Sequence, residues 1–283
     1  MGKKGKIVST INAKGGVGKT MTTQNLGHSL ANQGRKVLIL DIDQQCNTTS
    51  TLCGPDVVQG LTLYDIMNAD SQIDPARCIL PTPYDNMDIL PNHPMSGLLE
   101  PTLREDLSVG YLLMRKILRN FIITNYDYAL IDCPPDMGVL VYNAMIMSDA
   151  VIVPLECRSR YSIDGLNKAL ELIEGIQGSV NPDLRILRLL INKVDMRSSS
   201  DKSWVAQTEK AFPGQVFNTT IPENSDFKDA EAQFKTIIRH APGSRGARKI
   251  RDLCQEFLST MEQDPWPEEY KPPLADHESS EED

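Results

Sequence analysis

Residues 14–20 of the chain, Lys-Gly-Gly-Val-Gly-Lys-Thr, decide the fold. They lie between an apolar stretch, residues 6–12, and a stretch with helical spacing, residues 20–33, which ends before a glycine. A glycine-rich loop between a strand and a helix turns backbone N–H groups toward the helix N-terminus, where the helix dipole also favours an anion. Glycines also let the main chain approach phosphate groups closely. The stretch therefore predicts a loop that binds the phosphates of a nucleotide.

Single side chains of this loop have predicted roles. Lys19 is expected to pair with the β- and γ-phosphates, and the hydroxyl of Thr20 to bind Mg²⁺. Lys14 departs from the usual loop, because it precedes the glycine pair and Ala13 stands where a first glycine is common. A plain turn is the alternative for the loop, and a solvated lysine is the alternative for Lys14. The residues predicted to bind nucleotide here are Lys14, Gly15, Gly16, Val17, Gly18, Lys19, Thr20 and Met21.

Short apolar runs alternate with helical patterns along the rest of the chain. The runs at residues 37–40, 128–131, 150–153 and 186–191 have the continuous apolar character of strands that are buried on both faces. Helical patterns follow or separate them at residues 108–124, 138–147, 162–176 and 202–212, and a last helix is predicted over residues 244–261. This alternation indicates an α/β fold with a doubly wound, mainly parallel sheet flanked by helices, as in P-loop NTPases. The stretch 53–101 is predicted to be the most irregular.

Composition divides the chain into a body and an acidic tail. Of the 283 residues, 40% are hydrophobic, which suits a single large domain over residues 1–260. The net charge is −9, but residues 261–283 hold nine acids and one base, which leaves the body close to neutral. Because the tail also holds four prolines and few apolar residues, it is predicted to be disordered.

Composition also bears on the compartment. No apolar run approaches the 18–20 or so residues that a membrane span needs. The basic N-terminus is followed by a strand-like segment, where a signal peptide would have its apolar core. The six cysteines form no C-x-x-C pair and match no common zinc spacing, which favours buried thiols in a reducing compartment. We expect a soluble cytoplasmic protein.

Acidic residues follow two of the predicted strands. Asp41 and Asp43 come after the run at residues 37–40, and Asp132 comes after the run at residues 128–131, before two prolines. The carboxyl ends of parallel strands line the ligand crevice of an open α/β sheet, and carboxylates hold Mg²⁺ directly or through water. The predicted metal site consists of Thr20, Asp41, Asp43 and Asp132. The alternative, that the acids cap turns, suits Asp41 better than Asp43.

These motifs together resemble the deviant Walker-A ATPases of the ParA/MinD family, in family order over about residues 6–260. The loop has that family's KGGVGKT form, residues 132–135 match its D-x-P-P, and residues 41–47 resemble its D-x-D-P-Q-x-N with Gln44 in place of proline. The resemblance implies ATP and Mg²⁺ as ligands and a slow ATPase whose catalytic residues are Lys14, Lys19 and Asp43. In it, Lys14 reaches the partner's phosphates in an ATP-bound dimer, Asp43 positions or activates the attacking water, and Asp41 supports the metal shell.

Two weaker segments resemble the base-binding region of the same family. Residues 190–195, LINKVD, follow a predicted strand, and residues 221–224, IPEN, resemble the I-P-x-N segment beside adenine. The resemblance implies adenine contacts from Asn192, Pro222 and Asn224, and an asparagine amide has the donor and acceptor that the edge of adenine needs. An ordinary turn remains the alternative for each segment.

The segment 235–251 carries cations and no acid, and it resembles the closing motif of the family, with Ile250 in place of a common tyrosine. The resemblance implies that the ATP-bound dimer holds DNA here through phosphate charge, without reading sequence. A solvated helix face is the alternative, and operator-specific binding is not expected because no helix-turn-helix region precedes the first strand. The predicted DNA-binding residues are Lys235, Arg239, Arg245, Arg248, Lys249 and Arg251.

The resemblance predicts an ATP-dependent dimerising switch that partitions or positions DNA, either plasmid or chromosome, or another intracellular cargo. It implies a homodimer in the ATP state, nonspecific DNA, and a ParB-like or other cargo-linked activator as partners, with no membrane and with nucleoid association. Three alternatives are a Min-type membrane-surface ATPase, an iron–sulfur relative such as the nitrogenase iron protein, and a binding module without turnover. The acidic C-terminal end argues against the first, the cysteine spacing against the second, and the complete set of loop and acidic residues against the third.

Overall fold

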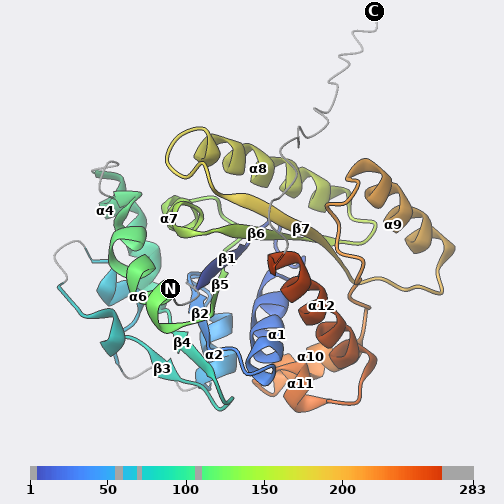
Figure 1. The fold of residues 1–283 in the computed structure, drawn as a ribbon, viewed down its shortest axis with the longest axis horizontal. Helices are drawn as coiled ribbons and strands as arrows, with labels where there is room; N and C mark the ends of the chain where they lie inside the picture. Colours follow the sequence, from blue (N-terminus) through green and yellow to red (C-terminus); the bar gives the residue numbers. More distant parts are fainter. Residues whose placement is uncertain (1–4, 55–59, 69–71, 106–109, 263–283) are drawn as a thin grey trace, which may run out of the picture.

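A seven-stranded sheet forms the centre of the molecule (Figure 1). The computed structural model describes residues 5–54, 60–68, 72–105 and 110–262, so the tail from residue 263 and its predicted disorder lie outside the described part. The strand order is β3-β4-β2-β5-β1-β6-β7, and neighbouring strands are parallel except β3 and β4. The strands are β1 (Lys6–Thr10), β2 (Val37–Asp41), β3 (Leu80–Pro81), β4 (Met87–Leu90), β5 (Tyr128–Asp132), β6 (Ala150–Glu156) and β7 (Arg185–Asn192).

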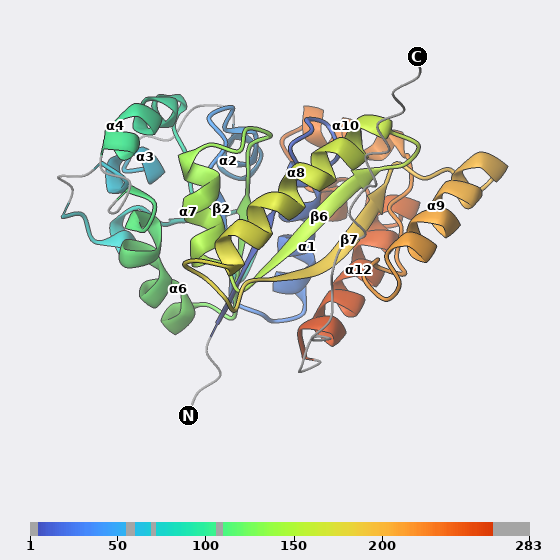
Figure 2. The ribbon, with the colours of Figure 1, turned by 90° about the horizontal axis from the view of Figure 1, so that it is seen from above.

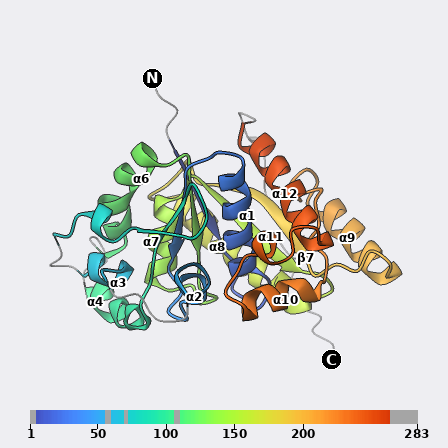
Figure 3. The ribbon, with the colours of Figure 1, turned by 90° about the horizontal axis from the view of Figure 1, so that it is seen from below.

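Helices cover both faces of the sheet (Figures 1 and 2). Apolar side chains of one face form a core with α1 (Lys19–Asn32), α2 (Asn47–Cys53), α11 (Ile237–His240) and α12 (Arg245–Glu262). The core of the other face includes α3 (Leu63–Ile66), α4 (Leu99–Glu105), α6 (Asn120–Asn125), α7 (Val139–Met147), α8 (Arg160–Gln177) and α9 (Ser199–Ala211). Figure 3 shows α10 (Ser225–Ala232) and α11 beside α1 and α12. This arrangement confirms the predicted doubly wound, mainly parallel α/β fold.

The central strands end level with one another. In the register of β2 and β5, Asp41 lies opposite Asp132, and in that of β1 and β5, Thr10 also lies opposite Asp132. β2 and β5 are buried along their whole length, which explains their continuous apolar runs. The register therefore brings the phosphate loop, which follows β1, together with the acids that end β2 and β5.

The stretch predicted to be irregular contains two strands that were not predicted, β3 and β4. β4 pairs in parallel with β2, with Leu40 opposite Leu90. Its four residues, Met-Asp-Ile-Leu, follow Asn86, whose φ is 60°. A strand this short shows no periodic pattern, and its burial comes from pairing with β2 rather than from local sequence. The same stretch also contains two 3-10 turns, η1 (Pro75–Arg77) and η2 (Pro94–Leu98).

The helix predicted over residues 108–124 is interrupted where the chain is described. A π-helical stretch (Arg115–Arg119) precedes α6, and residues 106–109 lie outside the described part. Asn143 of α7 accepts a hydrogen bond from the N–H of Met114 at 3.0 Å and donates one to the carbonyl of Gly110 at 2.7 Å. A side chain of a neighbouring helix thus takes backbone groups that a regular helix would pair internally. None of the described helices is long and apolar enough to cross a membrane.

The two edges of the sheet are formed by different means. β3 consists of two residues, one of which, Pro81, has no N–H group. The outer side of β7 is joined by a later segment, because the N–H of Leu189 donates to the carbonyl of Gln215 at 2.7 Å and the N–H of Phe217 donates to the carbonyl of Leu189 at 2.9 Å. A second bridge joins Val194 to Pro222. This pairing also brings residues 221–224 to the carboxyl end of β7, at the edge of the sheet where the glycine loop follows β1.

Candidate active site

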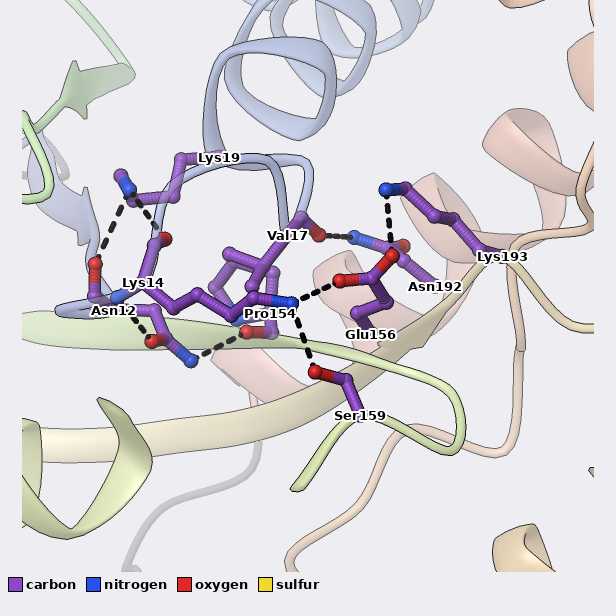
Figure 4. Close-up of polar contacts among 9 residues, drawn as sticks. All are labelled: Asn12, Lys14, Val17, Lys19, Pro154, Glu156, Ser159, Asn192 and Lys193. Carbon is purple, nitrogen blue, oxygen red and sulfur yellow. Dashed lines mark hydrogen bonds and ion pairs between the residues drawn. The ribbon is translucent and has the colours of Figure 1, made fainter. Parts of the chain in front are cut away.

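The phosphate loop is braced from β7. Gly18 precedes α1 with a φ of 97°, in the left-handed region that side chains rarely adopt. A Cβ atom on Gly18 would lie 2.6 Å from Nδ2 of Asn192, and this Nδ2 donates a hydrogen bond to the carbonyl of Val17 at 2.7 Å (Figure 4). Asn192, at the end of β7, therefore fixes the shape of the loop, and position 18 requires glycine.

A second brace comes from Asn12, which follows β1. Its Nδ2 donates to the carbonyl of Pro154 in β6 at 2.9 Å, and its Oδ1 accepts the N–H of Lys14 at 2.8 Å (Figure 4). Sequence reasoning did not single out Asn12, because one asparagine before a loop carries no spacing signal. Asn12 can brace the loop because the fold places β6 beside β1.

Lys19 lies along the inside of the loop. Its side chain is buried, and Nζ donates to the carbonyl groups of Asn12 and Lys14, each at 3.1 Å. Burial lowers the pKa of the Lys19 ammonium, while the charges of Asp132 and Asp43 act in the opposite direction. The ammonium therefore lies inside the loop, held by two of its carbonyl groups, where it could pair with phosphates.

Lys14 is engaged by its own chain. Its Nζ pairs with the carboxylate of Glu156, at the end of β6, and donates to Oγ of Ser159 at 2.7 Å (Figure 4). Glu156 also pairs with Nζ of Lys193 at 2.8 Å. Partial burial raises the pKa of the Glu156 carboxyl, but the two lysines outweigh this effect and hold the pKa below its usual value. Glu156 and Ser159 were not predicted, and no motif in the sequence links them to the loop.

Asp41 is fully buried and bonded to the protein on both oxygens. Oδ2 accepts the N–H and the hydroxyl of Thr49 at 2.8 and 2.7 Å, and Oδ1 accepts the N–H of Asp43 at 3.1 Å. Burial, followed by the charge of Asp132, raises the pKa of Asp41 well above its usual value. These contacts place Asp41 beneath the site, where it orders the loop that carries Asp43.

Asp132 has one bonded oxygen and one buried oxygen without a partner. Oδ2 accepts the hydroxyl of Thr48 at 2.7 Å, whereas Oδ1 has no hydrogen bond of normal geometry among the described residues. Burial raises the pKa of Asp132 above its usual value, although the hydroxyls of Thr48 and Thr20 act in the opposite direction. Hydrated Mg²⁺ is commonly bound by a carboxylate oxygen, directly or through water. Oδ1 of Asp132 is buried, has no other partner among the described residues, and belongs to a carboxylate whose pKa the Thr20 hydroxyl lowers. The residues therefore fit a magnesium ion.

Asp43 is the acid that reaches the pocket. It is partly exposed, lines the cavity, and accepts the N–H of Gln45 on Oδ1 at 3.0 Å. Asp43 and Lys19 line the same cavity, and the charge of Asp43 raises the pKa values of Lys19 and Asp132. The strand register thus brings together the loop lysine and the acids that the sequence placed at strand ends.

A cavity of about 570 Å³ joins these parts, a volume within the range of small-molecule sites. Of the residues predicted to bind nucleotide or metal, Lys14, Asp41 and Asp132 are not in its lining. Asn224 lines it while its Oδ1 accepts the N–H of Asp226 at 2.9 Å as the N-cap of α10. Phe227 of α10 lines it too and was not predicted. The predicted residues in the lining are Gly15, Gly16, Val17, Gly18, Lys19, Thr20, Met21, Asp43, Asn192, Pro222 and Asn224.

The basic segment begins at this cavity. Lys235 was predicted to contact DNA, and the structure places it in the cavity lining together with Ile237. Phe234 before it has a φ of 52°, and this left-handed turn directs the chain back from α10 toward the cavity. The other five cations belong to α11 and α12, where three are exposed and two are partly buried: Arg239, Arg245 and Arg248, then Lys249 and Arg251.

The start of α11 is bonded to α1, the helix that follows the phosphate loop. The N–H of Ile237 donates to Oδ1 of Asn25 at 2.7 Å. Nδ1 of His28 lies 2.6 Å from the hydroxyl of Thr236, and the His28 ring packs against Tyr84 with 4.2 Å between ring centroids. One helix therefore contacts both the phosphate end of the cavity and the first residues of the basic segment.

The site combines a braced glycine loop after the first strand, a buried lysine inside that loop, and acids at the ends of two neighbouring strands. These features define a P-loop nucleotide-binding protein. Residues 5–186 match the AAA_31 family, described as an AAA domain. The chain belongs to this family, and the resemblance to ParA/MinD-type ATPases drawn from the motifs is confirmed.

Two relatives are similar over nearly their whole length. The chain is 36% identical over 255 residues to the sporulation initiation inhibitor protein Soj of Bacillus subtilis, which covers 90% of this chain and 99% of that protein. It is 31% identical over 254 residues to the chromosome partitioning protein ParA of Caulobacter vibrioides, covering 90% and 94%. Among solved structures, cobyrinic acid a,c-diamide synthase from Mycobacterium smegmatis, with a bound ATP analog and magnesium, superposes with a TM-score of 0.76 at 26% identity, covering 91% and 96%.

Proposed function

We propose that this protein is an ATP-dependent dimerising switch that binds DNA nonspecifically and positions DNA or another intracellular cargo. The observation that carries the proposal is the shared boundary of the nucleotide cavity and the basic segment. Lys235 and Ile237 line the cavity, and the cations of α11 and α12 follow directly. A ligand in the cavity therefore lies next to the surface that would hold DNA. The similarity to a chromosome partitioning protein, ParA of Caulobacter vibrioides, supports the positioning part of the proposal.

The ligand proposed for the cavity is ATP with Mg²⁺. The loop N–H groups and Lys19 would hold the phosphates, and Thr20 and Asp132, the latter through water, would hold the metal. The metal, when bound, supplies positive charge to the phosphate oxygens. Pro222 and Asn224 lie where the base would be held.

Asp43 is the residue proposed to orient the attacking water. It is the acid that combines exposure to the cavity with proximity to Lys19 and Asp132. Phosphoryl transfer needs positioning and charge stabilisation more than covalent participation by the protein. This makes a single well-held carboxylate sufficient for slow hydrolysis that a cargo-linked, ParB-like activator would accelerate.

Lys14 is proposed to act across the dimer. Its contacts with Glu156 and Ser159 lie at the rim of the cavity, and Glu156 is part of the lining. A lysine at this rim has the reach to leave its own chain and approach the phosphates of a partner. In that state it would add positive charge where negative charge develops during hydrolysis.

Nonspecific DNA would bind the exposed cations of α11 and α12. Phosphate contacts of this kind depend on charge and weaken steeply with salt. The protein would then be cytoplasmic and associate with the nucleoid in its ATP state. A plasmid, a chromosome or a protein assembly each suits this mechanism as cargo.

The test is binding to a nonspecific DNA duplex without nucleotide, with ADP and with ATP–Mg²⁺, over a salt series. We expect binding with ATP alone, a longer lifetime for Asp43→Ala, and a steep loss with salt. Arg248→Ala should lower the salt slope by about one, whereas Lys210→Ala, an exposed cation on α9, should not. Dimerisation by ATP without DNA binding would overturn the DNA part of the proposal and leave the ATPase.

A further inference from the structure

Asp43 stands in a turn that follows the last paired residue of β2. The turn is closed by the N–H of Cys46, which donates to the carbonyl of Asp43 at 2.9 Å. Cys46 has a φ of 52°, a left-handed conformation that is costly for a residue with a side chain. Such a turn holds its shape only where its surroundings fix it. Neighbouring residues must therefore hold the peptide groups of Asp43.

Asn92 holds one side of that turn. The parallel register of β4 with β2 places Leu90 opposite Leu40, so Asn92, two residues further, comes level with the start of the turn. Asn92 is 1% exposed, and its Nδ2 donates to the carbonyl of Asp43 at 3.0 Å. The N–H of Asp43 is held from the other side by Oδ1 of Asp41 at 3.1 Å. Hydrogen bonds therefore hold both the N–H and the carbonyl of Asp43.

Thr49 connects the two residues, Asn92 and Asp41, that hold the backbone of Asp43. The N–H of Asn92 donates to Oγ1 of Thr49 at 2.9 Å, and the Thr49 hydroxyl donates to Oδ2 of Asp41 at 2.7 Å. A closed chain of buried hydrogen bonds therefore runs from Asp41 through Thr49 and Asn92 to Asp43. Residues that follow Asn92 form the outer wall of the turn, because the side chain of Gln44 lies against the backbone of Gly97.

The Asn92 side chain is poorly explained by packing alone. Its Oδ1 is buried and has no hydrogen-bond partner among the described residues. A buried polar atom without a partner lowers stability, and an apolar side chain would avoid that loss. The residue keeps an amide for the bond that its Nδ2 makes to Asp43. That bond holds the backbone of Asp43, whose side chain lines the cavity.

We propose that Asn92 is a positioning residue for ATP hydrolysis, which sets the turn so that the Asp43 carboxylate faces the phosphate loop. The assignment rests on the proposed ATPase function. Asn92 acts on the backbone of Asp43 and lies outside the cavity lining. Loss of its amide should therefore slow the chemical step and leave nucleotide binding intact.

The first experiment compares ATP turnover and ADP affinity of the wild-type protein and Asn92→Ala. We expect kcat to fall at least tenfold while KM for ATP and the ADP dissociation constant stay within twofold. The matched control is Asn181→Ala, since Asn181 is 7% exposed and its amide donates to the carbonyls of Met145 and Ser148 at 3.1 and 2.8 Å, away from the cavity. The control should lose stability and keep kcat.

A second variant keeps the volume of the side chain. Asn92→Asp presents a carboxylate to the carbonyl of Asp43, and a carboxylate cannot donate. Its kcat at pH 8 should therefore fall at least tenfold, as in Asn92→Ala, while its KM for ATP and its ADP dissociation constant stay within twofold. A purely structural role would lower binding and turnover together.

A third measurement needs no turnover. Amide hydrogen exchange of Cys46, whose N–H closes the turn, should be at least tenfold faster in Asn92→Ala, while exchange in β2 stays unchanged. Wild-type kcat in a folded Asn92→Ala protein, or equal losses of kcat and ADP binding, would overturn the assignment alone. A wild-type protein that binds ATP without hydrolysing it would overturn the proposed function, and this assignment with it.

Discussion

The side chains of Lys14 and Glu156 form an ion pair within one chain, between the first lysine of the phosphate loop and the end of β6. Both side chains keep about a quarter of their surface exposed, at 26% and 24%. If Lys14 acts on the phosphates of a partner subunit, this ion pair must break first. The pair would therefore oppose the proposed ATP-bound dimer.

Glu156→Gln should make the ATP-bound dimer form at lower protein concentration. A partly exposed ion pair is worth up to about 1 kcal/mol, or roughly a fivefold change in a binding constant. The measurement is sedimentation at saturating ATP in an Asp43→Ala background, which is expected to prevent turnover. Asp252→Asn is the control, because it removes a similar pair with Lys249 on α12. An unchanged or weaker Glu156→Gln dimer would contradict the prediction.

Gly18→Ala and Gly15→Ala should separate loop shape from phosphate access. At Gly18, the positive φ and the nearby Asn192 amide should together cost about 1–2 kcal/mol of unfolding free energy. A Cβ on Gly15 meets no atom within 4 Å, so its variant should keep its stability within about 0.5 kcal/mol and lose nucleotide affinity. Denaturant unfolding without nucleotide and calorimetric titration with ADP measure the two effects. Equal stability of the two variants would count against the brace from β7.

His28 should make stability depend on pH between about 6.5 and 4. Burial, followed by the charges of Arg239 and Arg251, lowers the pKa of His28 to about 4. The unfolded chain therefore takes up a proton below pH 6.5 that the folded chain takes up only near pH 4, so stability present above pH 6.5 is lost as the pH falls. The loss has an upper limit of about 3 kcal/mol.

The measurement for His28 is the difference in unfolding free energy between wild type and His28→Asn, from pH 7.5 to pH 4.5. That difference should shrink or change sign toward acid, since asparagine does not titrate. His240→Asn, at a partly exposed position on α11, serves as the control. A constant difference between wild type and His28→Asn across this range would refute the assignment.

Deletion of residues 264–283 should tighten DNA binding at low salt. The deleted segment carries eight acids and one base, and a chain of that charge competes with DNA phosphates for the cations of α11 and α12. The gain should vanish above about 0.3 M salt, where charges are screened. A variant with the eight acids replaced by their amides should behave like the deletion. Unchanged affinity at low salt would remove this role from the tail.

The sequence was sufficient where one local pattern determines both structure and chemistry. The phosphate loop, the acids at the ends of β2 and β5 and most of the helices follow from short motifs and apolar periodicity. It was insufficient where contacts depend on which strands become neighbours. Asn92 acquires its role because β4 pairs with β2, and Glu156 meets Lys14 because β6 lies beside β1. Lys235 reached the cavity through the left-handed turn at Phe234, which a count of charges does not reveal.

The closed edges of the sheet bear on how copies of this protein can meet. Pro81 at one edge has no donor to offer, and residues 215–222 take up the backbone groups of β7 at the other. A neighbouring copy therefore finds little on which to extend the sheet, which is the usual route to amyloid-like stacking. The proposed self-association would therefore use side-chain surfaces around the nucleotide cavity, where a bound ligand could switch it on and off. Many copies bound along one DNA molecule, as proposed, would then still be able to separate from one another.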